Sequence, residues 1–411
     1  MTAGGVVSVA DALARILATA PEPLAAEDVG LAEGFGRTLA HDLVARRTQP
    51  PFDVSAMDGF ALRAADAGEG ACLHLVGRSA AGAGHRAPLA PGQAVRIFTG
   101  APVPPGADAI LIQENARYDA QTVTVVEPPV AGRHIRRAGL DFREGETGLV
   151  AGTRLNPAEL ALAAAMNHPV LPVVRRPLVA ILATGDELVR PGEVPGPDQI
   201  VASNTFAIVA HVKAAGGRVL DLGLVRDDID AIVAAVRHAE TSGADVLVTL
   251  GGASVGDHDL VQAALVQAGM DLAFWKIAMR PGKPMMHGRI GGMRVLGLPG
   301  NPVSSIVGGV LFLRPLIRAL CGDPRAGTDP TEPAVLGADL PANDMRQDYL
   351  RGTLACPEDG GLPCASANRA QDSSMLRILA GAGCLVVRPP YAPAARAGEP
   401  CRIIRLDRYP F

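Results

Sequence analysis

Glycine and carboxylate residues follow three apolar runs of strand length in this sequence. The run LVAILA is followed by TGDE (184–187), DVLVTL by GGASVGDHD (251–259), and RVLGL by PGNPVSS (299–305). Glycines let the backbone approach a ligand closely, and backbone amides beside carboxylates suit a phosphate ester together with Mg2+. The pattern therefore predicts a pocket for both, with carboxylates at Asp186, Glu187, Asp257 and Asp259.

A single loop of this kind is more often an ordinary turn than a binding site. Three such loops favour a site, because the carboxyl ends of parallel strands meet at one edge of a sheet. The common nucleotide motifs GxxxxGK[ST] and a strand-following GxGxxG are absent from the sequence. In the third loop we expect Asn301 to cap a helix that begins at Pro302, which leaves backbone N–H groups facing the pocket.

A basic segment, residues 275–284 (WKIAMRPGKP), carries three cations within eight positions. Two of them, Lys276 and Lys283, are among only three lysines in a chain that otherwise uses arginine. A charge run is usually a solvated loop. The compact ammonium group of lysine nevertheless suits a small tetrahedral oxyanion or a terminal phosphate, so we favour a binding role for this segment.

A second acidic segment, residues 52–61 (FDVSAMDGFA), has two carboxylates around small residues. These residues alone are equally compatible with a turn and with a functional site.

The elements that must position these residues fall into distinct regions. Residues 176–325 alternate apolar strand-length runs with helical patterns, which predicts a three-layer, doubly wound α/β domain. Residues 48–141 contain short β runs between glycine and proline turns, which predicts an inserted β domain of barrel or sandwich type. Residues 1–47 and 142–175 are expected to pack together as a split helical N-terminal domain, with a helix beginning at Pro157. Residues 330–411 are expected to form a small C-terminal β domain.

Composition excludes several classes of protein. The 411 residues have a net charge of -4 and are 48% hydrophobic, which excludes a disordered chain and a broad basic surface for nucleic acid. Six scattered cysteines show no zinc spacing, and no apolar run reaches the length of a membrane span. The N-terminus is a poor signal peptide, so we expect a cytoplasmic protein.

Seven segments, in order along nearly the whole chain, resemble the MoeA molybdopterin molybdenumtransferase family, which is related to the E domains of gephyrin and plant Cnx1. They are PPFDVSAMDGFALRAAD, IFTGAPVPPGADAI, IRRAGLDFREGE, VAILATGDELVRPGE, TLGGASVGDHD, WKIAMRPGKPMMHG and VLGLPGNPVSS. The resemblance implies a multidomain α/β and β protein with a MogA-like α/β domain and a barrel-like C-terminal domain. It also implies a cytoplasmic homodimer that inserts molybdenum from molybdate into adenylylated molybdopterin with Mg2+, releasing AMP.

The resemblance also assigns roles to residues at matching positions. It implies catalytic roles for Asp58, Thr99, Asp141, Glu187, Asp227, Asp259, Lys276, Arg280 and Lys283. It implies Mg2+ ligands at Asp186, Glu187 and Asp259. Together with the loop pattern, it predicts cofactor contacts at Gly251, Gly252, Ser254, Pro299, Gly300, Asn301, Pro302, Ser304, Arg351 and Ser373.

Two alternative functions remain open at this point. A molybdopterin adenylyltransferase shares the α/β domain, although the flanking β domains argue against it. A non-catalytic scaffold like the gephyrin E domain is the other alternative, because a fold does not prove catalysis. Partners could include the enzyme that makes the adenylylated pterin and the maturation partners of molybdoenzymes, while neither nucleic acid nor a membrane is expected.

Overall fold

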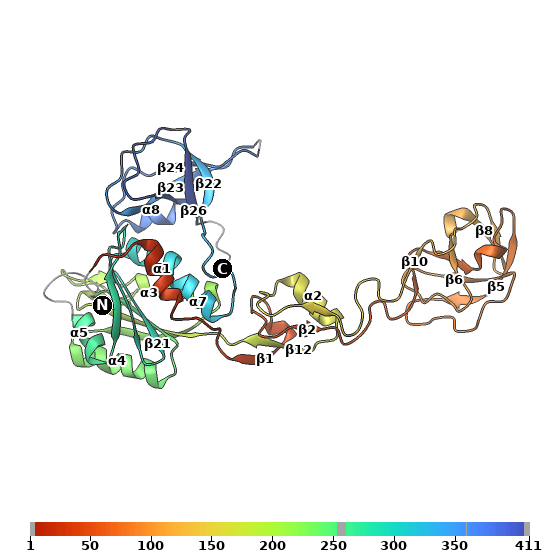
Figure 1. The fold of residues 1–411 in the computed structure, drawn as a ribbon, viewed down its shortest axis with the longest axis horizontal. Coiled ribbons are helices and arrows are strands. Elements are labelled where there is room, and N and C mark those ends of the chain that lie inside the picture. The colour runs from red at the N-terminus through yellow and green to blue at the C-terminus, as the bar shows by residue number, and fades with distance from the viewer. Residues whose placement is uncertain (1–4, 253–259, 359, 407–411) are drawn as a thin grey trace. The chain divides into compact units, whose positions relative to one another are not determined.

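The computed structural model describes residues 5–252, 260–358 and 360–406. The chain forms two compact units (Figure 1). One unit, which we call the α/β unit, consists of Met1–Glu27, Gly36–Ala40 and Val173–Phe411. The other, which we call the lobe unit, consists of Asp28–Phe35 and His41–Pro172. Each unit is described separately below.

The α/β unit is built around a six-stranded sheet with the order β16-β13-β17-β21-β20-β18. The strands β16 (Arg218–Val225), β13 (Leu178–Thr184), β17 (Val246–Leu250) and β21 (Met293–Leu298) are parallel. The strands β20 (Pro284–Ile290) and β18 (Asp271–Lys276) continue the sheet in antiparallel pairing. All five residues of β17 are buried, as expected for a strand with helices on both faces.

Helices cover both faces of this sheet and form two apolar cores. The helices α4 (Ile229–Thr241) and α5 (Leu260–Gln267) bury Ile232, Val236 and Leu265 on one face. The helices α3 (Asn204–Ala215), α6 (Pro302–Gly308) and α7 (Arg314–Leu320) cover the other face (Figure 1). These layers confirm the predicted three-layer α/β domain.

The stretch Pro302–Leu320 is the central helix of this packing. Among the described residues it is the one helix long and apolar enough to cross a membrane by composition, and 78% of it is buried within the fold. Such burial is typical of a core helix in a globular protein.

The N-terminal helix α1 (Val9–Leu17) begins at Ser8, whose side chain accepts a hydrogen bond from the Asp11 amide. Its residues Ala12 and Ile16 are fully buried in the core beneath α7. We expected residues 1–47 to pack with 142–175, and for α1 this expectation is wrong. An amphipathic helix buries its apolar stripe against whichever surface the tertiary fold offers, which the pattern itself does not specify.

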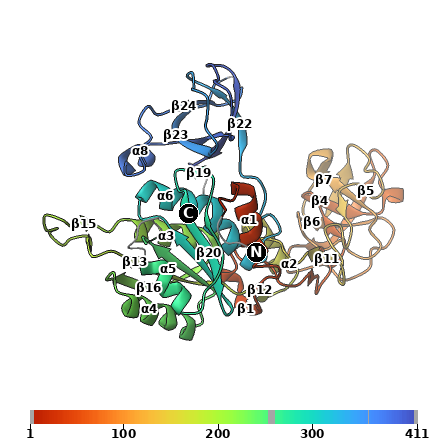
Figure 2. The same ribbon diagram turned by 60° about the vertical axis from the view of Figure 1, so that its left-hand side comes forward.

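The C-terminal region of the α/β unit is a small closed barrel. Its ring runs β23-β24-β22-β26-β25 and closes because β25 also pairs with β23. These strands are β22 (Glu332–Leu336), β23 (Gln347–Ala355), β24 (Cys364–Ala367), β25 (Cys384–Arg388) and β26 (Pro400–Arg405). Figure 2 labels β22, β23 and β24 of this barrel. The short strand β19 (Met279–Arg280) pairs in parallel with β23 and so connects the basic segment to the barrel.

The lobe unit contains a second six-stranded sheet, with the order β7-β4-β6-β5-β9-β8. Its strands are β4 (Gly59–Leu62), β5 (Cys72–Ser79), β6 (Gln93–Ile97), β7 (Ala109–Ile112), β8 (Ala116–Tyr118) and β9 (Thr122–Val125). Within this unit the flanks of the sheet do pack together, since β2 (Leu43–Val44) pairs with β11 (Thr147–Leu149). The helix α2 (Pro157–Ala165) begins at Pro157 as predicted, with Asn156 and Glu159 forming a capping box. The remaining expected domain boundaries stay predictions.

Candidate active site

The three predicted loops converge on one cavity of about 530 Å³ at the carboxyl ends of β13, β17 and β21. The strand β15 (Ile200–Val201) and the starts of α3 and α5 also line it. Its lining includes Thr184, Gly185, Glu187, Ser203, Asn204, Asp227, Gly251, Gly252, Pro299, Gly300, Asn301 and Pro302. A cavity of this size is in the range of sites for small organic ligands.

Glycine is required in the floor of this cavity. Gly251 has φ +97°, and a Cβ atom there would lie 2.8 Å from the Thr184 carbonyl oxygen. Gly252 also has a positive φ, of +61°. A Cβ atom on Gly300 would lie 3.5 Å from the Gly251 Cα, so the second and third loops touch through their backbones. The glycines therefore bring backbone groups to the cavity surface that side chains would cover.

The third loop differs from its predicted capping geometry. Asn301 occupies the N-cap position and Pro302 the first turn of α6, but the Asn301 side chain makes no capping hydrogen bond. The Val303 amide instead donates to the carbonyl oxygen of Ser373 at 3.0 Å. The side chain of Asn204 donates to the Gly300 carbonyl at 2.6 Å. A contact from a distant segment thus replaces the local cap, and Ser304 is buried beneath the loop.

The carboxylates of Glu187 and Asp227 lie at the cavity wall, with Asp186 beside them. Desolvation raises the pKa of Asp227, and the negative charges of Glu187 and Asp186 raise it further. The hydrogen bond from the Asp186 backbone amide lowers this pKa and only partly offsets the increase. Within the described residues, no group of three His, Cys, Asp or Glu side chains has the geometry of a metal site. The predicted residues Ser254, Asp257 and Asp259 lie outside the described residues.

The basic segment reaches this cavity only through Pro284. Lys276 places its ammonium nitrogen 5.2 Å from the centre of the Trp275 ring. Lys283 is exposed and lines a separate hollow of about 240 Å³ with Asp344 and Arg346. Among the described residues, therefore, the three cations and the glycine loops do not share one cavity lining.

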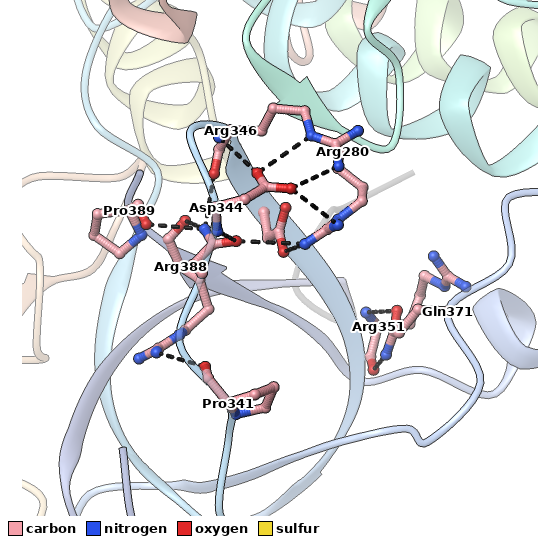
Figure 3. A network of polar contacts seen from close by, with 10 residues as sticks. Arg280, Pro341, Asp344, Arg346, Arg351, Gln371, Arg388 and Pro389 are labelled. Carbon is pink, nitrogen blue, oxygen red and sulfur yellow. Dashed lines mark hydrogen bonds and ion pairs between the residues drawn. The ribbon is translucent and has the colours of Figure 1, made fainter. Parts of the chain in front are cut away.

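Arg280 is engaged by the barrel. Its guanidinium forms an ion pair with Asp348 and lies 3.5 Å from an oxygen of Asp344. Figure 3 shows the Asp344 carboxylate between the side chains of Arg280 and Arg346. A guanidinium nitrogen of Arg346 lies 2.7 Å from an oxygen of Asp344. The two arginines together keep the pKa of Asp344 at about 2, chiefly through the hydrogen bonds from Arg346.

The predicted residues Arg351 and Ser373 lie in the barrel region. The backbone of Ser373 contacts the third loop. Arg351 is 1% exposed, and its guanidinium donates to the Asp372 carbonyl at 2.9 Å. Its backbone and the Gln371 side chain exchange two hydrogen bonds, of 3.0 and 2.9 Å (Figure 3). Arg351 thus holds the turn that presents the Ser373 carbonyl to Val303.

In the lobe unit, Asp58 and Thr99 are in direct contact. The amide and the hydroxyl of Thr99 donate to the same Asp58 oxygen at 2.7 and 2.9 Å. These bonds lower the pKa of Asp58, and the charge of Arg96 lowers it further. Gly59 is required beside them, since a Cβ atom there would lie 2.1 Å from the Leu111 carbonyl oxygen. Asp141 is exposed, and its amide donates to Gln49.

Two contributors were not identified from the sequence. Residues 200–205 form one cavity wall, and the signal was the polar pair Ser203-Asn204 at the start of the predicted helix. Arg96 contacts the Asp58 region from the neighbouring strand, and the sequence around it indicated only a short β run.

Three family descriptions match the chain in order. Residues 7–167 match the MoeA N-terminal region (domain I and II), 180–319 a probable molybdopterin binding domain, and 333–406 the MoeA C-terminal region (domain IV). The molybdopterin molybdenumtransferase of Haemophilus influenzae is 34% identical, over 94% of this chain and 96% of that protein. The protein of the same name from Nostoc sp. is 35% identical, over 92% and 88%.

A solved structure supports the same relationship. The molybdopterin biosynthesis MoeA protein from Pyrococcus horikosii superimposes with a TM-score of 0.81 at 29% identity, covering 98% of this chain and 99% of that chain.

Proposed function

The chain belongs to the MoeA family of molybdopterin molybdenumtransferases, and from this premise we propose the substrates, the cation and the residues that its reaction uses. The protein is a transferase of molybdenum cofactor biosynthesis that inserts molybdenum into molybdopterin. The substrates we propose are adenylylated molybdopterin and molybdate, with AMP and molybdenum cofactor as products.

The observation that carries this proposal is the convergence of three glycine-bearing loops on one cavity of about 530 Å³. Backbone groups of Gly251, Gly252 and Gly300 lie at its surface, where they suit the phosphate oxygens of the pterin. We place Ser254 and the contacts of Pro299, Asn301 and Pro302 in the same role. Lys276 and Lys283 supply positive charge for molybdate in this proposal, and Arg280 supports the segment that carries them.

We propose Mg2+ as the cation for these carboxylates, because Asp186, Glu187 and Asp227 are hard oxygen donors. Burial raises the pKa of Asp227, and the charges of Glu187 and Asp186 raise it further; a bound dication would relieve this repulsion. We propose Asp186, Glu187 and Asp259 as its ligands. Bound there, Mg2+ would neutralise phosphate charge during loss of the adenylate.

The protein's own residues act mainly by binding and orientation. The glycine loops hold the phosphate, while Glu187 and Asp227 set the charge of the cavity wall. We propose that Asp58, Thr99 and Asp141 complete the site from the lobe of a second subunit in a homodimer. Positioning of this kind supplies much of the rate enhancement when charge is redistributed on a phosphate. We further propose that the reaction takes place in the cytoplasm.

Reconstitution with defined components tests the proposed function. The purified protein, adenylylated molybdopterin, molybdate and Mg2+ should release AMP and activate an apo-molybdoenzyme. Asp186→Asn and Lys276→Ala should each lower that rate about 100-fold, as loss of one charged contact to a reacting group commonly does, while Arg289→Met should retain it. Formation of the adenylate from ATP and molybdopterin would instead support the adenylyltransferase, and no turnover of any of these substrates would support a scaffold.

A further inference from the structure

Arg96 lies at the centre of an aromatic cluster on the sheet of the lobe unit. It is on β6, directly opposite Phe60 of β4. Its guanidinium carbon lies 4.8 Å from the centre of the Phe60 ring and 5.2 Å from those of Phe98 and Tyr118. Phe60 and Tyr118 also pack edge to face, with 5.0 Å between ring centres. Rings on several sides restrict where the guanidinium can lie.

From this position Arg96 forms hydrogen bonds with two segments next to Asp58, one adjacent in the chain and one adjacent in space. One of its terminal nitrogens donates to the carbonyl oxygen of Gly59 at 3.2 Å, and the other donates to the Gln113 side chain at 2.8 Å. The backbone amide of Gln113 in turn donates to the backbone carbonyl oxygen of Asp58 at 3.2 Å. Arg96 therefore ties together the residue after Asp58 and the residue that holds the Asp58 backbone.

The carboxylate of Asp58 is held separately, by Thr99. The turn that carries Thr99 is closed by the Ala101 amide, which donates to the Phe98 carbonyl at 2.9 Å, and Gly100 has φ +79°. Phe98 is also one of the rings that contact Arg96. The same guanidinium thus contacts the backbone on one side of Asp58 and the turn that orients its carboxylate on the other.

Arg96 makes no ion pair with a carboxylate within the described part of the chain. Its charge is consequently not neutralised by a salt bridge, and it is directed towards the Asp58 region. A guanidinium suits this task because its planar fork can donate in two directions at once while its face stacks on rings.

We infer that Arg96 is a positioning residue for Asp58, which fixes the backbone and the supporting turn so that the carboxylate faces the substrate in one orientation. This inference rests on the proposed catalytic role of Asp58. Arg96 does not itself contact the reacting groups in this scheme and acts through Asp58 alone.

The test compares Arg96→Met and Arg96→Lys with Arg78→Met. Arg78 is the register partner of Arg96 on β5 and lies 4.5 Å from the same Phe98 ring, yet no hydrogen bond links it to the Asp58 region. Arg96→Met should lower kcat for molybdenum insertion about 10- to 100-fold, as loss of an orienting group typically does, with KM changed much less. Arg96→Lys should recover part of the rate, and Arg78→Met should stay within about twofold of the wild type.

Two further measurements separate positioning from a general effect on folding. The double variant Asp58→Asn/Arg96→Met should be no slower than Asp58→Asn alone, because Arg96 acts through that carboxylate. Should Arg96→Met disturb the lobe, Gln113→Leu removes one of the two bonds and keeps the aromatic cluster, and it should also lower kcat. Carbon NMR of the Asp58 carboxyl should show a higher pKa in Arg96→Met and no change in Arg78→Met.

The outcomes distinguish this inference from the proposed function. A slow Asp58→Asn together with wild-type rates for Arg96→Met and Gln113→Leu would overturn the positioning role alone. A wild-type rate for Asp58→Asn would overturn the catalytic role of Asp58, and the positioning role would fall with it. A double variant much slower than Asp58→Asn would show that Arg96 acts elsewhere.

Discussion

Arg280 and Asp348 form an ion pair across the parallel pairing of β19 with β23. The Asp348 side chain is only 5% exposed, whereas that of Arg280 is 45% exposed. The second oxygen of Asp348 is buried and has no hydrogen-bond partner among the residues that the structure describes. One cation of the basic segment therefore compensates a buried charge of the barrel, in addition to any role in binding molybdate.

This pair predicts that Arg280 contributes to stability. Arg280→Met should lower the free energy of unfolding by about 1–3 kcal/mol, because it leaves the buried Asp348 carboxylate without its donor. Urea denaturation measures this loss, and Arg280→Lys should recover part of it. The exposed Arg289→Met serves as the matched control and should change stability by less than about 0.5 kcal/mol. Equal stability of Arg280→Met and the wild type would contradict the interpretation.

The carboxylates of the cavity predict that the effect of Mg2+ on Tm depends on pH. Because desolvation and the charges of Glu187 and Asp186 raise the pKa of Asp227, the folded protein keeps this proton to higher pH than the unfolded chain does. Without a cation, its contribution to stability therefore falls as pH rises from the ordinary aspartate value through the raised value. Mg2+ should raise Tm more at about pH 7 than at about pH 4, near the ordinary pKa of aspartate.

Glu187→Gln provides the matching variant for this prediction. It removes one repelling charge and one proposed ligand, so the increase in Tm with Mg2+ at neutral pH should shrink. Glu193→Gln is the control, since Glu193 accepts a hydrogen bond from the Arg190 amide and lies outside the cavity lining. An equal effect of Mg2+ on Tm at both pH values would argue against a cation site here.

The close approach of Gly251 to Thr184 predicts that Gly251→Ala and Gly243→Ala differ in their effect on molybdopterin binding. Gly251 and Gly243 both have positive φ, +97° and +73°, so alanine at either position should cost about 1–2 kcal/mol. Only at Gly251 would the new Cβ atom meet a neighbour, the Thr184 carbonyl, because Gly243 faces open space. Gly251→Ala should therefore also weaken molybdopterin binding, measured by fluorescence titration, while Gly243→Ala should bind normally. Equal affinities would show that the close approach at Gly251 is not needed.

The features that the sequence predicted correctly are those with local or strongly periodic causes. The start of α2 followed from Pro157 and the helical run after it, and the structure adds a capping box of Asn156 and Glu159 within the same turn. The common cavity of the loops after β13, β17 and β21 followed from a general property of parallel sheets, namely that their carboxyl ends meet at one edge.

The features that were missed depend on contacts between distant segments. Arg280 and Asp348 are 68 positions apart, and neither residue type at that spacing indicates a pair. The acceptor that replaces the expected Asn301 cap is the carbonyl oxygen of Ser373, in the barrel region, which accepts from the Val303 amide. The place of α1 was equally hidden, since an apolar stripe shows that a helix packs but not which surface it meets.

His287 predicts how the stability of the α/β unit changes in acid. The residue is fully buried, and its Nδ1 lies 2.9 Å from the Val295 carbonyl. Within the described part of the chain, its buried Nε2 has no hydrogen-bond partner. The neutral ring that donates from Nδ1 satisfies this environment. Burial lowers the pKa of His287 to about 4, and the nearby positive charge of Arg289 acts in the same direction.

Because the unfolded chain binds this proton near pH 6.5 and the folded chain only near pH 4, stability should fall as pH falls through that interval. The full difference corresponds to about 3 kcal/mol. His287→Asn keeps a donor in a similar position and removes the titration, so its stability should decline less steeply between those pH values. His238→Asn, on the exposed side of α4, should leave the slope unchanged. His211, whose pKa is also lowered to about 4 by burial, contributes equally in all three proteins, so the difference in slope isolates His287. Chemical denaturation at a series of pH values measures these slopes, and identical slopes for the wild type and His287→Asn would show that the folded protein protonates this ring as readily as the unfolded chain does.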